Sequence, residues 1–179
     1  MAGEETPVTE TIEQMIRVDH AGEYGAARIY AGQLAVMGNR SPIAPEIGRM
    51  KAQEARHLAV FDRLIVERRV RPTLLHPIWH VAGFALGAAT ALLGPDAAMA
   101  CTVAVETEID RHYQSQRDAL EDGKGGTRDP ELAAHIAEFQ AEEVEHKETA
   151  SAMGGTGFPI MSAAIRAGCR LAIAVTKRV

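Results

Sequence analysis

The tetrapeptide EVEH at residues 143–146 has the same form as EARH at residues 54–57, and this pair of motifs decides the expected fold. No glycine or proline lies within five residues of either motif, so both are predicted to lie inside long helices. Residues three apart share one face of an α-helix, so each motif can direct a carboxylate and an imidazole to one point. A single ExxH motif often arises by chance on a solvated helix, so the two copies carry weight only if other helices supply matching ligands.

A second repeat supplies those ligands. Residues 20–33 read HAGEYGAARIYAGQ, and residues 104–116 read AVETEIDRHYQSQ. Counting forward from Glu23 and from Glu106, an arginine follows at +5, a tyrosine at +7 and a glutamine at +10. The ligand helices then read Glu, ExxH, Glu, ExxH, which is the arrangement of ferritin-like di-iron and di-manganese carboxylate bundles. The predicted metal ligands are Glu23, Glu54, His57, Glu106, Glu143 and His146.

The alignment of the two halves also chooses between neighbouring glutamates. Glu106 has a tyrosine at +7 and Glu108 has none, so Glu106 is the predicted ligand. Glu142 aligns with Gln53, which cannot replace a carboxylate, so Glu143 is preferred over Glu142. The two tyrosines lie two turns beyond the ligating glutamates on the same face, where either a hydrogen bond to the site, a radical role or plain packing is open.

Charge and ligand type indicate iron. Four carboxylates facing one core would repel one another and lose hydration unless they were protonated or neutralised. Two divalent cations, four carboxylates and two neutral imidazoles sum to zero charge. Oxygen-rich ligation with two histidines favours iron or manganese over zinc or copper, so two iron ions per chain are predicted. The alternative is a set of solvent-exposed helical charge pairs with no common focus.

The 179-residue chain is expected to form one all-α domain, because aromatic residues are only 4 % and apolar residues recur at helical spacing. Spacing, glycines and prolines predict helices at residues 9–37, 43–69, 78–93, 95–120, 130–153 and 160–177. Four of them would form a ferritin-like bundle with two additional apolar helices. Residues 1–11 are expected to be a flexible tail, and residues 121–130 an exposed loop.

Composition excludes several classes of protein. The net charge of -5 provides no basic field for nucleic acid. Cys101 and Cys169 form no CxxC pair, which excludes thiolate zinc sites, a rubredoxin-type iron site and a disulfide scaffold. The N-terminal sequence MAGEETPVTET is acidic and polar, unlike a transit peptide or a secretory signal. We therefore expect a bacterial, cytoplasmic-facing protein, or one whose targeting segment has been removed.

The third predicted helix contains VAGFALGAATALLG, which has no charge but is too short to cross a bilayer. It is either a buried bundle helix, in which Gly83 and Gly87 allow close packing, or a helix lying in the membrane plane with Trp79 at the interface. We favour membrane contact, because a four-helix ligand core does not need two extra helices this apolar. The last helix could join it, and together they could line a path for a long apolar substrate.

The chain resembles the demethoxyubiquinone hydroxylase family of ubiquinone biosynthesis from about residue 12 to its end. The blocks that carry the resemblance are IRVDHAGEYGAARIYAGQ, QEARHL, RVRPTLLHPIWHVAGFALGAATALLG, ACTVAVETEIDRHY and EEVEHK. The resemblance implies a di-iron monooxygenase that uses O₂ to hydroxylate the ring of a polyprenyl demethoxybenzoquinol. The family's ligands fall on the same six residues, and its tyrosine and histidine near the site would be Tyr113 and His112.

The resemblance also implies the setting of this reaction. It predicts a peripheral membrane protein on the cytoplasmic side of a bacterial inner membrane, or on the matrix side of a mitochondrial one. Reduced nicotinamide could deliver electrons through the quinone, and the expected partners are a ubiquinone-synthesis complex and a lipid-binding accessory protein. A ferritin-like ferroxidase would share the ligands, and a lipid-binding module would share the apolar helices, but each explains only half of the sequence.

Overall fold

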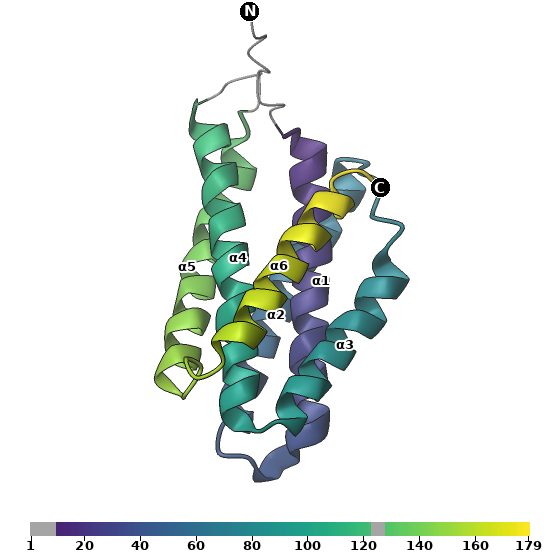
Figure 1. The fold of residues 1–179 in the computed structure, drawn as a ribbon. Helices are drawn as coiled ribbons and strands as arrows, with labels where there is room; N and C mark the ends of the chain where they lie inside the picture. Colours follow the sequence, from purple (N-terminus) through teal and green to yellow (C-terminus); the bar gives the residue numbers. More distant parts are fainter. Residues whose placement is uncertain (1–9, 123–127) are drawn as a thin grey trace, which may run out of the picture.

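The computed structural model describes residues 10–122 and 128–179, and these contain α-helices and no strand (Figure 1). The helices are α1 (Ile12–Met37), α2 (Ala44–Glu67), α3 (His76–Leu92), α4 (Pro95–Asp122), α5 (Pro130–Ala152) and α6 (Pro159–Thr176), with one 3-10 turn, η1 (Gly38–Arg40). The all-α prediction is confirmed. Most of the tail expected at residues 1–11 and half of the loop expected at 121–130 lie outside the described residues.

Local sequence signals set the helix ends. The α1 helix begins with a capping box, in which the Thr11 hydroxyl accepts from the Gln14 amide at 3.2 Å and the Gln14 side chain accepts from the Thr11 amide at 3.0 Å. It ends at Gly38, whose φ of 56° suits glycine. Asp129 caps α5 by accepting from the Leu132 amide at 3.0 Å. Four expected ends were wrong by two or three residues. The α1 helix begins three residues after Thr9, and α2 ends two residues before Arg69. The α3 helix begins two residues before residue 78, because Pro77 fits its first turn, and α4 continues two residues beyond Leu120.

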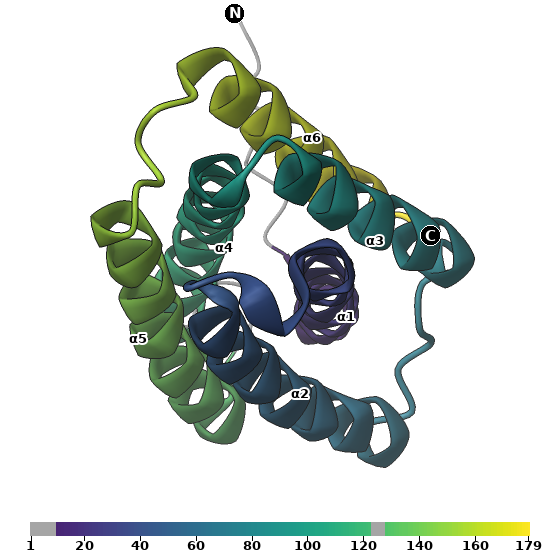
Figure 2. The ribbon, with the colours of Figure 1, turned by 90° about the horizontal axis from the view of Figure 1, so that it is seen from below.

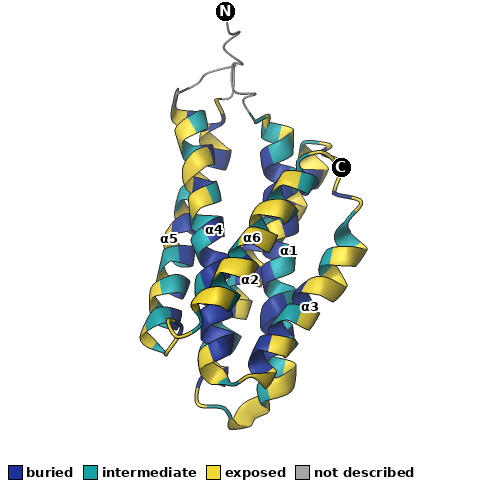
Figure 3. Ribbon diagram, in the orientation of Figure 1, coloured by how far each residue is buried: buried dark blue, intermediate teal, exposed yellow. Residues whose placement is uncertain are grey.

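Four helices surround one core, with α1 beside α2 and α4 beside α5 (Figure 2). Their buried faces point inward, as Figure 3 shows by colour. Two of the three apolar clusters of the described residues follow one another along the bundle, and the third lies where α6 packs on α1 and α4. Along α2, Met50 belongs to one cluster and Phe61 to the other, with Glu54 and His57 between them. A buried polar layer therefore lies between two apolar layers.

The α3 helix packs on α1 through glycines. A Cβ atom on Gly87 would overlap the Ile29 carbonyl oxygen, and one on Gly83 would lie 2.9 Å from the Gly25 carbonyl oxygen. The close packing expected from this glycine spacing is confirmed. On the other side of α3, Val81 is 66 % exposed, so the helix is buried on one face and apolar and open on the other.

Candidate metal centre

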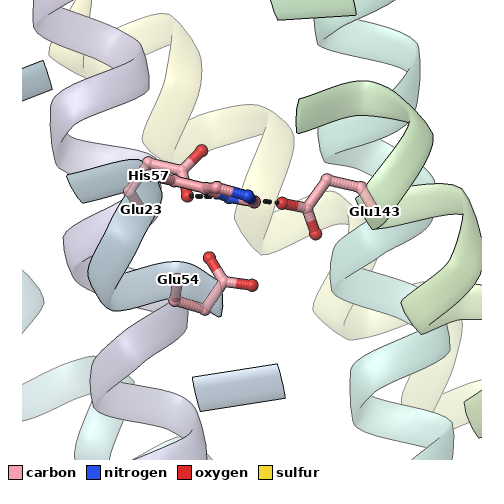
Figure 4. Close-up of side chains that lie close together, drawn as sticks. All are labelled: Glu23, Glu54, His57 and Glu143. Atoms are coloured by element: carbon pink, nitrogen blue, oxygen red, sulfur yellow. Dashed lines mark hydrogen bonds and ion pairs between the residues drawn. The ribbon is translucent and has the colours of Figure 1, made fainter. Parts of the chain in front are cut away.

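The six predicted ligands come from the four bundle helices and converge in the buried polar layer. Glu23 lies on α1, Glu106 lies on α4, and each of α2 and α5 contributes one ExxH motif. Their potential ligand atoms form two groups, each within 4.8 Å: Glu23, Glu54, His57 and Glu143, and Glu54, Glu106, Glu143 and His146. Figure 4 shows the first group. The two groups share two glutamates, and each has one glutamate and one histidine of its own.

The described residues fit a pair of metal ions. Both carboxylate oxygens of Glu54 and one oxygen of Glu106 are buried and accept no hydrogen bond from a described residue. Such unpaired buried acceptors cost free energy, and a cation would satisfy them. Oxygen donors with one imidazole per position suit iron or manganese.

The electrostatics of the cluster support the same interpretation. Burial, and then the charge of Glu143, raises the pKa of Glu54 and of Glu106 well above the ordinary value. Burial also acts on Glu143, but hydrogen bonds from His146 and His57 outweigh it and lower the pKa of Glu143 to about 2. Burial opposes the charged form of His57, yet hydrogen bonds to Glu143 and Glu23 raise its pKa to about 10. The cluster therefore retains protons that bound cations would displace.

Each repeated tyrosine hydrogen-bonds the glutamate of the other half. The Tyr30 hydroxyl donates to Glu106 Oε1 at 2.6 Å, and the Tyr113 hydroxyl donates to Glu23. Of the roles open to these tyrosines, the structure shows a hydrogen bond to the site. Each half of the duplicated sequence therefore hydrogen-bonds a proposed ligand of the other half.

Other residues singled out from the sequence lie outside the cluster. The His112 Nε2 atom is 3.3 Å from Asp19 Oδ1 and 2.9 Å from Gln116 Nε2, and among the described residues it hydrogen-bonds none of the six. Its ring lies beside that of Tyr113, with centroids 6.5 Å apart. Glu108 is buried but pairs with Arg166 and Arg170 of α6. A role for His112 in the reaction therefore stays a prediction and would act through its neighbours.

Two residues at the site were missed. Glu142 Oε2 lies 3.0 Å from His57 Nε2, and Gln53 Oε1 lies 3.0 Å from His146 Nε2. The residue before the glutamate of each ExxH motif therefore holds the histidine of the other motif. The sequence signal for this contact is the alignment of Gln53 with Glu142, which places a hydrogen-bonding side chain at the same position in both motifs.

An apolar cavity of about 510 Å³ lies beside the centre, between α1, α3, α4 and α6. Gly22 and Val105 line it, and they are the chain neighbours of Glu23 and Glu106. On the opposite wall lie Leu86 of α3 and Ile165 of α6. The helices that carry two of the acidic residues on their inner side thus present an apolar wall on their outer side.

Comparison with known proteins places this chain among enzymes of quinone synthesis. The family described as "Ubiquinone biosynthesis protein COQ7" matches residues 10–176. The 3-demethoxyubiquinol 3-hydroxylase of Rhodospirillum rubrum is 52 % identical over 182 residues, which cover 100 % of this chain and 83 % of that protein. The NADPH-dependent 3-demethoxyubiquinone 3-hydroxylase of Rattus norvegicus is 49 % identical over 93 % of this chain and 77 % of its own length. The chain therefore belongs to the COQ7 family of ubiquinone biosynthesis proteins.

Proposed function

We propose that the chain binds two iron ions and uses O₂ to hydroxylate the ring of a polyprenyl demethoxybenzoquinol, as a 3-demethoxyubiquinol 3-hydroxylase. The observation that carries the proposal is the convergence of four buried glutamates and two buried histidines beside an apolar cavity. The names of the relatives supply the reaction and substrate class. A ferroxidase would use the six ligands but has no need of the cavity.

The six ligands would hold the irons, which when bound supply the activation of O₂. The chain's own residues position these ligands and keep water out. Tyr30 and Tyr113 each bind one oxygen of a glutamate and leave the other oxygen for a metal. Hydroxylation places one oxygen atom on the ring and releases the other as water, which consumes two electrons and two protons. Reduced nicotinamide is the proposed electron source, in keeping with the name of the rat relative.

The cavity is proposed to hold the apolar part of the quinol. Its lining is almost wholly aliphatic or glycine, which suits a prenyl chain and offers few hydrogen bonds to a polar ligand. Trp79 of α3 and Ile173 of α6 line it as well, so the cavity runs along the two outer helices. A quinol whose tail follows these helices would place its ring near the metal helices α1 and α4.

The outer helices are also proposed to contact a membrane. Ile78 and Val81 of α3 and Ile160 and Leu171 of α6 are exposed, and both helices lie outside the four-helix core (Figure 2). Among the described residues, α6 alone has the length and composition of a membrane span, which is weak evidence by itself. Its arginines pair with Glu108 inside the fold, which favours α6 lying against the bundle. We place the protein peripherally on the cytoplasmic face of a bacterial inner membrane or the matrix face of a mitochondrial one.

Metal analysis followed by a turnover assay tests the proposal. Purified protein should contain about two irons per chain and should hydroxylate a short-tailed demethoxyquinol only when O₂ and a reductant are present. Protein that contains no iron, or that contains iron and leaves the quinol unchanged under these conditions, would contradict the proposal. Ferrous oxidation with growth of an iron mineral, without quinol turnover, would support the ferroxidase instead.

A further inference from the structure

The two cluster histidines are oriented alike. His57 Nδ1 faces the cluster, 3.1 Å from Glu23 Oε2 and 3.2 Å from Glu143 Oε1. His146 Nδ1 also faces it, 3.0 Å from Glu143 Oε2 and 3.3 Å from Glu54 Oε1. In both rings Nε2 points away from the cluster toward an oxygen atom of the opposing ExxH helix.

The contacts around those oxygens determine where the ring protons lie. Arg56 donates to both oxygens of Glu142, at 2.8 and 2.6 Å, so Glu142 is a carboxylate that only accepts hydrogen bonds. The amide nitrogen of Gln53 donates to Glu142 at 3.1 Å, which leaves the Gln53 oxygen facing His146. An accepting oxygen at each Nε2 requires that nitrogen to carry the proton. A bound metal would then displace the proton at Nδ1 and take the lone pair of that nitrogen.

The two accepting oxygens differ in charge. His57 donates to a carboxylate, whereas His146 donates to a neutral amide whose oxygen also accepts from Arg49 at 2.7 Å. A carboxylate partner makes an imidazole a stronger metal ligand than an amide partner does. Arg56 offsets part of the charge of Glu142, but its side chain is 49 % exposed and therefore screened by water. The duplicated halves supply the same ligand types, but they differ in the group that accepts the hydrogen bond from the histidine Nε2 atom.

We propose that Glu142 and Gln53 are positioning residues that make the two metal positions unequal, so that the position of Glu23 and His57 binds metal more tightly and fills first. The inference rests on the proposed metal centre. Hydrogen-bond partners of ligating histidines typically change metal affinity by about 10- to 100-fold. Both histidines keep a hydrogen-bond partner, and only its type differs, a carboxylate at His57 and an amide at His146. We therefore expect the two dissociation constants to differ by about tenfold, the lower end of that range.

A titration of metal-free protein with Co²⁺, followed by absorbance and calorimetry, measures both steps. The unchanged chain should show two steps whose dissociation constants differ by about tenfold. Glu106→Gln should keep the tighter step and lose the weaker one, and Glu23→Gln should do the reverse. These two variants identify the position that fills first.

Exchanging the residue types at positions 142 and 53 tests the proposal more directly. Glu142→Gln should weaken the tighter step, and Gln53→Glu should strengthen the weaker step, so each change alone brings the two constants together. In the variant that combines both changes, Glu106→Gln should now remove the tighter step. Glu138→Gln is the matched control, because Glu138 lies on α5 at 3.7 Å from the same Arg56 and hydrogen-bonds neither histidine among the described residues. It should leave both steps unchanged.

Equal dissociation constants for the two steps in the unchanged chain would overturn the proposed difference between the two positions. Loss of the tighter step in the single variant Glu106→Gln would do the same. Either result would leave the proposed metal centre intact. An unchanged separation in Glu142→Gln would also overturn the proposed difference. If circular dichroism shows that Glu142→Gln is unfolded, the response of Gln53→Glu decides. Failure of the unchanged, folded chain to bind any metal would overturn the proposed function as well.

Discussion

At the scale of single residues, Glu54 and Glu143 differ from the other proposed ligands because both groups of potential ligand atoms include them. Glu54→Ala or Glu143→Ala should therefore remove most of the iron from both positions, since each change takes away charge and a ligand common to the pair. Iron measured by atomic absorption on purified variants checks this. Glu108→Gln is the control and should keep its iron, because Glu108 pairs with arginines outside the cluster. Full iron in both alanine variants would disprove the ligand assignment.

Tyr113 stabilises a glutamate that cannot reach water. Tyr113→Phe should lower the free energy of unfolding by about 1–3 kcal/mol, because it leaves a buried carboxylate oxygen of Glu23 without its donor. Chemical denaturation of metal-free protein measures the change. Tyr24→Phe removes the hydroxyl of a more exposed tyrosine and should cost less. Equal losses in the two variants would show that Tyr113 contributes packing alone.

Asp19 is expected to make stability depend on pH. Burial raises its pKa from 3.8 to about 6, so between these values the folded state binds more protons than the unfolded state. The carboxyl group has no net effect below pH 3.8, and its ionisation destabilises the folded protein as pH rises through about 6. The shift corresponds to about 3 kcal/mol. Asp19→Asn stays neutral, so its stability relative to the unchanged chain should rise between pH 4 and 7. Denaturation curves that keep a constant difference across this range would contradict the assignment.

At the scale of helices, α6 contacts the bundle through one buried charge as well as through apolar packing at Ile165. Glu108 is 2 % exposed and accepts from Arg166 at 2.7 Å and from Arg170 at 2.9 Å. The same helix forms a wall of the apolar cavity. The ion pairs therefore hold a wall of the proposed tail site, and they explain a buried glutamate that is not directed at the metal cluster.

Removing the two arginines should loosen that wall. In Arg166→Met/Arg170→Met the carboxylate of Glu108 loses its α6 partners, and we expect a loss of about 1–3 kcal/mol, less than for a fully buried pair because both arginines reach water. Affinity for a long-tailed quinol should fall while iron content holds. Adding Glu108→Gln should restore much of the stability, because no buried charge then remains. Iron loss in the double variant would contradict the separation of α6 from the metal centre.

At the scale of the whole molecule, the apolar outer face and the cavity can be tested separately. Val81 lies on the exposed face of α3, whereas Leu86 lines the cavity. Val81→Glu should weaken liposome binding by repulsion from anionic lipid, and it should spare turnover of a short-tailed quinol. Leu86→Glu should reduce turnover of a long-tailed quinol even in detergent. Ala141→Glu, on the exposed face of α5, is the charge control. Equal liposome binding by Val81→Glu and Ala141→Glu would contradict membrane contact through α3.

Local sequence patterns were sufficient to predict the helices and the candidate ligand set. Some helix ends depend on glycines and prolines within a few positions, such as Gly38 and Pro130, and were predicted locally, whereas the cap at Thr11 was not. The ligand set could be read because the chain is duplicated: the same spacing from Glu23 and from Glu106 distinguished ligands from neighbouring glutamates. The structure brings those six residues together, while their role as ligands stays a prediction.

Contacts between residues on different helices could not be predicted from these patterns. The pairing of Tyr113 with Glu23, of Glu142 with His57, and of Glu108 with Arg166 of α6 joins residues 58 to 90 positions apart in the chain. These contacts depend on the rotation and crossing of each helix, which result from many side-chain contacts acting together, such as the close approach of α3 to α1 at Gly87. Periodicity shows which face of a helix is buried, but it does not show which side chain of another helix lies opposite.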